Sequence, residues 1–161
     1  MSTGVAVLLS VRPDRLTALR EALAALGEPE HSPLARLGQT HMARFVVVEE
    51  AIRDGPCLLF SAEADAQASS YLALVAERLP EAEPVWEQCR GYPGAGDPAS
   101  VARWLAEHAM PAGFSVRPYP RSTVTEVREA LDLRARLRDF AIRAQDLEPA
   151  ALQRAWREEF G

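Results

Sequence analysis

The chain has 161 residues, of which 48% are hydrophobic and 25% are charged, which is the composition of a globular protein that can bury a sizeable core. The formal net charge of -5 argues against a general nucleic-acid binder and against a protein of anionic membrane surfaces. All 18 basic residues are arginine, which excludes chemistry that depends on a catalytic lysine in this chain.

The two cysteines, Cys57 and Cys89, are too few for a disulfide framework. The N-terminal residues lack the basic segment and the long apolar run of a secretory signal. No stretch approaches the ~20 consecutive apolar residues that a membrane-spanning helix needs. We therefore expect a cytoplasmic protein that binds neither membrane nor nucleic acid.

Hydrophobic periodicity predicts five elements in the first half of the chain. They are, in order, a strand at 5–11, a helix at 13–27, strands at 40–48 and 56–64, and a helix at 65–79. An Asp-Gly turn signal between the two middle strands indicates a hairpin. Asp65 stands where a helix N-cap is expected.

The second half predicts mainly helices. They are a helix at 97–110 with Asp97 as its N-cap, a long helix at 122–145 and a short closing helix after Pro149. In the long helix, Asp132 with Arg136 and Asp139 with Arg143 are expected to pair at i,i+4. A strand at 113–120 would complete an α+β, ferredoxin-like β-α-β-β-α-β antiparallel sheet. We therefore expect a domain at 1–121 with a C-terminal helical extension, 122–161, packed on it.

The strand at 40–48 predicts that both faces of the sheet are covered. Regular alternation places His41, Ala43, Phe45 and Val47 on one face and leaves Thr40, Met42, Arg44, Val46 and Val48 on the other. Both faces become apolar toward the end of the strand, whereas a face in water would be polar. The cover would be the C-terminal helices or the sheet of a second subunit, as in dimeric α+β barrels.

Several stretches together resemble a known family. THMARFVVVEE, LLFSAEADAQASSYL, VWEQCRGYPG and RPYPRSTVTEVREALDLR resemble, in order and spacing, a bacterial ferredoxin-like domain of unassigned activity. Such domains occur alone or in association with peroxidase-like oxidative enzymes. The resemblance implies the α+β fold and an oxidative-enzyme association, but no particular reaction. The chain departs from the family pattern at Ala66, where a glycine is expected.

His41 is the candidate catalytic residue. At the entry of a strand it could act as a general base, a proton shuttle or an axial heme ligand. The alternative is a structural histidine whose ring bonds a neighbouring carbonyl or carboxylate. We favour the structural role and expect a largely buried side chain, because Ala43, Phe45 and Val47 share its face and lead into the core.

Arg44, Tyr92 and Tyr119 are the candidate substrate-binding residues. Arg44 could clamp a carboxylate or pair with Asp65 or a glutamate. A regular strand places it on the face opposite His41, whereas a β-bulge would change that. Tyr92 and Tyr119 could line a cleft beside the GYPGAG loop, although such aromatic residues more often pack a loop on the core.

The remaining polar candidates favour structural roles. We expect Asp65 to be a helix cap, Cys89 a structural thiol and His108 a helix-end histidine. His31 lies in a predicted loop and carries no signal. No ligand spacing indicates a metal site.

Three functions remain open from the sequence. The first is a small-molecule-binding protein, and a candidate enzyme of oxidative or biosynthetic metabolism, with a pocket between the sheet and its cover. The second is a non-catalytic module that forms a homodimer or docks on an oxidative enzyme. The third is a heme-binding, peroxidase-like protein. No cofactor is predicted under the first two.

Overall fold

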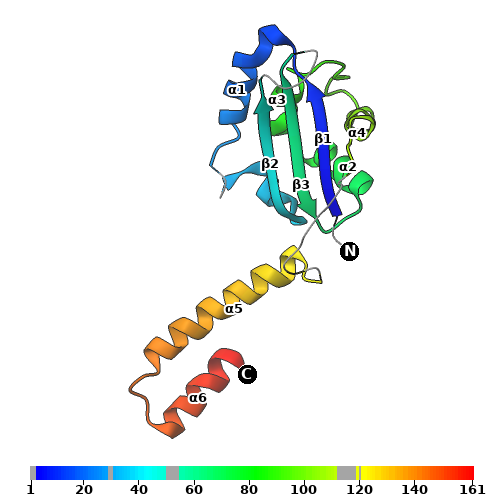
Figure 1. The fold of residues 1–161 in the computed structure, drawn as a ribbon. Helices are drawn as coiled ribbons and strands as arrows, with labels where there is room; N and C mark the ends of the chain where they lie inside the picture. Colours follow the sequence, from blue (N-terminus) through cyan, green and yellow to red (C-terminus); the bar gives the residue numbers. More distant parts are fainter. Residues whose placement is uncertain (1–2, 29–30, 50–54, 112–118, 120) are drawn as a thin grey trace. The chain divides into compact units, whose positions relative to one another are not determined.

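The structure is a computed structural model that describes residues 3–28, 31–49, 55–111, 119 and 121–161. The chain forms two compact units, Met1–Val124 and Thr125–Gly161. The first unit is an α+β domain, and the second is a helical hairpin (Figure 1).

The described sheet has three antiparallel strands in the order β1-β3-β2. They are β1 (Thr3–Ser10), β2 (Thr40–Val48) and β3 (Cys57–Ala64). The three strands predicted at 5–11, 40–48 and 56–64, and the antiparallel pairing of the predicted hairpin, are confirmed. The hairpin turn at 50–54 lies outside the described residues. β1 and β2 therefore run parallel to each other on either side of β3.

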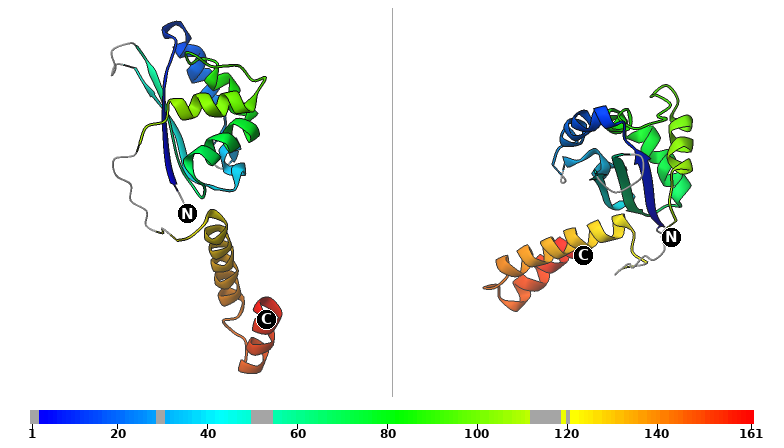
Figure 2. Two further views of the ribbon diagram at one scale, coloured as in Figure 1. Left: turned by 90° about the vertical axis from the view of Figure 1, so that its right-hand side faces the viewer. Right: turned by 45° about the horizontal axis from the view of Figure 1, so that its top comes forward.

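The helices of the first unit lie on one side of this sheet (Figure 2). They are α1 (Leu16–Ala24), α2 (Ala68–Arg78), α3 (Glu83–Trp86) and α4 (Pro98–Glu107), with short 3-10 turns η1 (Pro13–Arg15), η3 (Pro33–Leu37) and η4 (Pro80–Ala82). The predicted helices at 13–27 and 65–79 thus share one face. Asp97 caps α4 as expected, since its side chain accepts hydrogen bonds from the N–H groups of Ala99 and Ser100.

The predicted fourth strand, 113–120, falls largely on residues that the structure does not describe. The segment just before it nevertheless pairs with the outer edge of β1, where Ala109 forms an antiparallel bridge with Val7. Cys89 forms a second bridge with Val11 at the far end of the same edge. These backbone contacts satisfy groups that a bare edge strand would expose.

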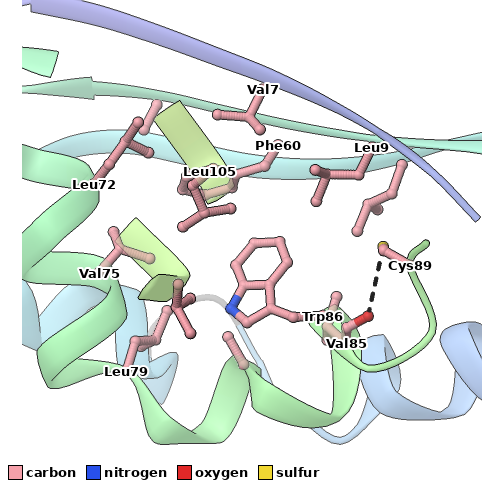
Figure 3. Close-up of a cluster of buried hydrophobic side chains, with 14 of the residues drawn as sticks. Val7, Leu9, Phe60, Leu72, Val75, Leu79, Val85, Trp86, Cys89 and Leu105 are labelled. Atoms are coloured by element: carbon pink, nitrogen blue, oxygen red, sulfur yellow. Dashed lines mark hydrogen bonds between the residues drawn. The ribbon is translucent and has the colours of Figure 1, made fainter. Parts of the chain in front are cut away.

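The core lies between the sheet and the helices, around the indole of Trp86 (Figure 3). Phe60 of β3 packs against it with ring centroids 5.8 Å apart, and Phe45 of β2 lies 5.0 Å from Phe60. Leu72 and Val75 of α2 close the cluster. Burial of each such side chain stabilises the fold by about 1.5–3 kcal/mol.

One local expectation is corrected by the turn that joins β3 to α2. The N-cap of α2 is Gln67 and not Asp65, whose carboxylate is engaged elsewhere. Ala66 stands where the family pattern has glycine, yet no described non-glycine residue has a positive φ. The turn therefore accepts alanine without backbone strain.

The second unit contains α5 (Val124–Arg143), which begins at the last residue of the first unit, and α6 (Pro149–Phe160). The two predicted C-terminal helices are confirmed. The expected i,i+4 partners are not used as predicted, because Arg136 and Arg143 both bind Glu159 of α6, with N–O distances of 3.5 and 3.0 Å. Asp139 instead contacts Arg138. A residue on the facing helix thus replaces a neighbour on the same helix.

The open face of the sheet is the side away from the helices of the first unit. Val46 lies there and is 38% exposed, whereas Phe60 points to the helices and is fully buried. Cover of this face, and packing of 122–161 on the domain, stay predictions. Among the described residues, no helix combines the length and apolarity that crossing a bilayer requires.

Candidate functional site

A β-bulge in β2 places His41 where a regular strand would not. Thr40 pairs with Ala64 of β3, and Met42 pairs with the adjacent Glu63. His41 is therefore an extra residue opposite a single step of the partner strand. As a result Thr40 belongs to the helix-covered face, where its hydroxyl lies 2.9 Å from the Tyr71 hydroxyl, and Met42 belongs to the open face.

His41 contacts Asp65, the residue that follows β3. The Nε2 atom of His41 lies 2.7 Å from Oδ1 of Asp65. The His41 side chain is 27% exposed and that of Asp65 is 13% exposed. The expected hydrogen bond of His41 is confirmed, but the expectation of a largely buried side chain is wrong, because the bulge removes His41 from the face that Ala43 shares with the core.

Asp65 is held from its other side by the backbone. Its Oδ2 accepts a hydrogen bond of 2.6 Å from the N–H of Val124. Burial alone raises the pKa of the Asp65 carboxyl, but the hydrogen bonds from Val124 and His41 favour the ionised form, and the pKa lies below its ordinary value. Asp65 is therefore an ionised acceptor fixed at both oxygens.

The ionised carboxylate determines which nitrogen of the His41 imidazole carries the proton. Because Asp65 can only accept, Nε2 of His41 must carry the proton of their hydrogen bond. Nδ1 of the neutral ring is then the acceptor, and it has no hydrogen-bond partner among the described residues. A histidine oriented by a carboxylate, with its second nitrogen available, can accept a proton from a bound molecule and return it.

Arg44 lies on the open face in the next row of the sheet. Its Nε donates a hydrogen bond of 3.0 Å to Oγ of Ser61, its partner on β3. The bulge takes His41 out of the regular alternation, so the side chains of His41 and Arg44 are no longer assigned to opposite faces of the sheet. Both the Arg44–Ser61 contact and the His41–Asp65 contact are accessible to solvent.

Glu63 extends the polar part of the open face toward β1. Its carboxylate lies over Gly4, where an added Cβ would come within 2.9 Å of Oε1. Glycine at this position therefore leaves room for the acidic side chain on the sheet surface. Glu63 lies in the row Gly4–Glu63–Met42, which is next to the row Ala6–Ser61–Arg44.

Apolar rows continue the open face beyond Arg44. Leu8, Leu59 and Val46 align across the three strands in one row. Ser10, Cys57 and Val48 form the next row. The open face thus combines a polar end, with two basic side chains and two carboxylates, with an apolar floor.

The other candidates lie elsewhere. Tyr92 is on the helix side of the sheet, where its ring centroid lies 5.6 Å from that of Trp104, and it lines a cavity of about 140 Å³ with Trp86. Tyr119 is 73% exposed, and its carbonyl accepts a hydrogen bond from Ser122. The structure therefore does not bring Tyr92 to the face that carries Arg44.

The expected structural roles of Cys89 and His108 agree with their surroundings. Cys89 is buried, its thiol contacts the carbonyl oxygen of Val85, and burial raises its pKa to about 12 (Figure 3). His108 ends α4, and its Nδ1 lies 2.8 Å from the Trp104 carbonyl. His31 lies outside the sheet in the loop before η3. These surroundings favour structural roles for Cys89 and His108.

Sequence reasoning missed two residues of the open face, Ser61 and Glu63. Their signal was present, because they alternate with the buried Phe60, Ala62 and Ala64 in β3. Among the described residues, no group of three or more His, Cys, Asp or Glu side chains is placed to hold a metal ion. Heme binding stays a prediction, which the presence or absence of a Soret band in the purified protein would test.

Comparison with known proteins adds one structural likeness. No protein-family model matches the chain, and no curated protein matches it in sequence. A solved structure, the tetracenomycin F2 cyclase from Streptomyces glaucescens, described as a type-II polyketide cyclase, is similar over 71% of this chain and 97% of its own. The sequence identity is 14% and the TM-score is 0.43, which is too low to carry an argument about function.

Proposed function

We propose that the open face of the sheet binds a small organic molecule and that His41, held by Asp65, exchanges a proton with it. The observation that carries this proposal is the 2.7 Å contact between His41 Nε2 and Asp65 Oδ1, which leaves Nδ1 of the ring available on an accessible surface. The proposal therefore describes a candidate enzyme that uses general acid–base catalysis.

The arrangement of the face favours a flat, largely apolar ligand with an oxyanion or a polarised carbonyl. Leu8, Leu59 and Val46 provide an apolar floor one row away from the Arg44 guanidinium. Arginine presents several donors in a fixed plane and suits carboxylate, phenolate or enolate oxygens. Ser61 orients that guanidinium through its hydrogen bond.

Asp65 contributes by fixing the histidine and not by contacting the ligand. Proton uptake at Nδ1 would turn His41 into an imidazolium, whose charge the adjacent carboxylate stabilises. Since Asp65 is also bonded to Val124, it can keep its position while the ring changes charge. General base catalysis of this kind contributes about 10²–10⁴-fold to a rate.

Water must be excluded for such a site to work well, and a cover over the open face would do so. The expected cover by C-terminal helices or by a second subunit remains part of the proposal. Electrostatic contacts to Arg44 and His41 would strengthen in the drier site that results. The cover would also bury the apolar row that contains Val46, which is 38% exposed.

A ligand screen with matched histidine variants tests the proposal. The full chain is titrated by NMR or thermal shift with a panel of aromatic and polycyclic carboxylates, phenols and ketones. We expect binding that Arg44→Gln weakens at least tenfold, and conversion of a bound compound that His41→Gln reduces at least 100-fold. His31→Gln is the control, since His31 lies outside the sheet. Equal effects of the two histidine variants, or ligand shifts confined to the Tyr92 side, would contradict the proposal.

A further inference from the structure

The helical hairpin of Thr125–Gly161 buries very little of its own apolar surface. Phe140 is its one buried residue, at 7% exposure, and every residue of this unit is described. Large apolar side chains remain exposed on both helices and on the turn between them: Leu131, Leu133, Leu137, Ile142, Leu147, Leu152 and Trp156. Two helices of this length cannot form an independent core. We therefore expect another protein surface to cover these exposed apolar side chains.

The hairpin is nevertheless a defined structure. Phe140, Trp156 and Phe160 form a cluster with ring centroids 4.6 to 5.5 Å apart. The Glu159 carboxylate forms a salt bridge with Arg143, with an N–O distance of 3.0 Å, and the guanidinium of Arg136 lies 5.1 Å from the centre of the Phe160 ring. These contacts fix α6 against α5 and therefore present the remaining apolar side chains in a constant arrangement.

Two open grooves run along this hairpin. The larger, of about 670 Å³, is lined mainly by apolar side chains of both helices, among them Leu137, Ala141, Ala144, Leu152 and Trp156. The second, of about 520 Å³, lies along Leu133, Trp156 and Phe160. The alanines leave room for another helix to approach closely, and the leucines and Trp156 offer side chains to interlock with it.

We propose that the larger groove is the interface with a second copy of this chain, whose hairpin completes a four-helix bundle. A second hairpin supplies two helices with the same apolar groove, and a two-fold axis makes such an interface self-complementary. The unit carries nearly equal numbers of acidic and basic residues, so self-association is not opposed by like charge.

The available area suits a dimer of modest size. Trp156 is 47% exposed, and an aromatic side chain offers roughly 150–250 Å² in total, so it alone contributes on the order of 100 Å². Leu137 and Leu152 are 37% and 38% exposed and flank it in the same groove. A second copy adds the same three side chains, so the apolar centre of the interface is small, and we expect a dimer at the weak end of specific association.

Sedimentation velocity of the full chain over a wide concentration range tests this interface. We expect the wild type to form a dimer with twice the 17.7 kDa mass of the chain. Leu152→Glu should weaken the dimer at least tenfold, because it places a carboxylate in the groove. Ile142→Glu is the matched control, since Ile142 is 61% exposed but lines neither groove, and it should change the dissociation constant less than threefold.

Two further variants keep the test decisive. Ala141→Arg blocks the same groove from the other helix without removing a packed side chain, and it replaces Leu152→Glu if circular dichroism shows that variant to be unfolded. Val46→Glu changes the open face of the sheet instead. A monomeric wild type, equal weakening by Ile142→Glu, or dissociation by Val46→Glu alone would overturn the proposal. Dissociation by Val46→Glu alone would place the dimer interface on the sheet. The proposed ligand site would still be tested separately by the ligand screen.

Discussion

The Asp65 carboxylate joins His41 and the Val124 backbone, with one oxygen 2.7 Å from the imidazole and the other 2.6 Å from the amide nitrogen. The three residues are one near the start of β2, the residue that follows β3 and the residue that opens α5. A single acidic side chain therefore links the bulge that carries the candidate base to a position 59 residues further along the chain.

Asp65→Asn should destabilise the domain. An amide keeps the size of the side chain but loses the charge that strengthens both hydrogen bonds, and loss of such a partner costs about 1–3 kcal/mol. Urea unfolding of the full chain measures the difference. Asp97→Asn is the control, because asparagine caps a helix about as well as aspartate does. Equal stability of Asp65→Asn and wild type would mean that the two contacts contribute nothing.

The contribution of Asp65 should depend on pH in a defined direction. Its pKa is lowered in the folded state, so its contribution is complete above the ordinary value of 3.8 and is lost as the pH falls through the lowered folded value. The gap in melting temperature between wild type and Asp65→Asn should therefore be constant near neutrality and should narrow below about pH 4. A gap that widens on acidification would contradict the assignment.

Cys89 should resist thiol reagents while the protein is folded. Burial raises its pKa to about 12, so the thiolate that reacts is scarce at neutral pH, and the side chain is only 3% exposed. Reaction with Ellman's reagent at pH 8 should proceed only as fast as the chain unfolds, and added urea should accelerate it. Rapid labelling of Cys89 in the native protein would reopen the possibility of a nucleophilic role.

Gly91 and Gly96 should respond differently to alanine. Gly91 has a φ of +73°, and a Cβ there would lie 3.4 Å from Nε1 of Trp104, whereas a Cβ on Gly96 meets nothing within 4 Å. A left-handed conformation costs a non-glycine residue about 1–2 kcal/mol. Gly91→Ala should therefore lower stability by about that amount, and Gly96→Ala should leave it nearly unchanged. Equal melting temperatures of the two variants would show that the loop relaxes freely.

The strands and helices could be predicted because their hydrophobic patterns are local. The run from Leu58 to Ala64 alternates buried and less buried side chains, and Asp97 caps α4 within three residues. Such signals depend on neighbours in sequence. They gave the order of the described elements and the antiparallel pairing of β2 with β3.

The candidate site could be predicted only in part, because its geometry depends on contacts between distant segments. Nothing in the THMAR stretch marks an extra residue at His41, and the bulge is visible only in the register against β3. The bond from Val124 likewise takes Asp65 away from the helix cap that its position suggests. His41 and Arg44 were identified as candidates, but the bulge that sets the position of His41 was not.

Replacement of His41 tests the central claim most directly. The full-length wild type and His41→Ala are compared in thermal melts and in turnover of a compound found to bind the open face. Since the His41 side chain is 27% exposed and Asp65 keeps its bond to Val124, we expect a stability loss of no more than about 1 kcal/mol together with an at least 100-fold loss of turnover. A variant that melts far below the wild type but retains full turnover would show that His41 only supports the end of its strand.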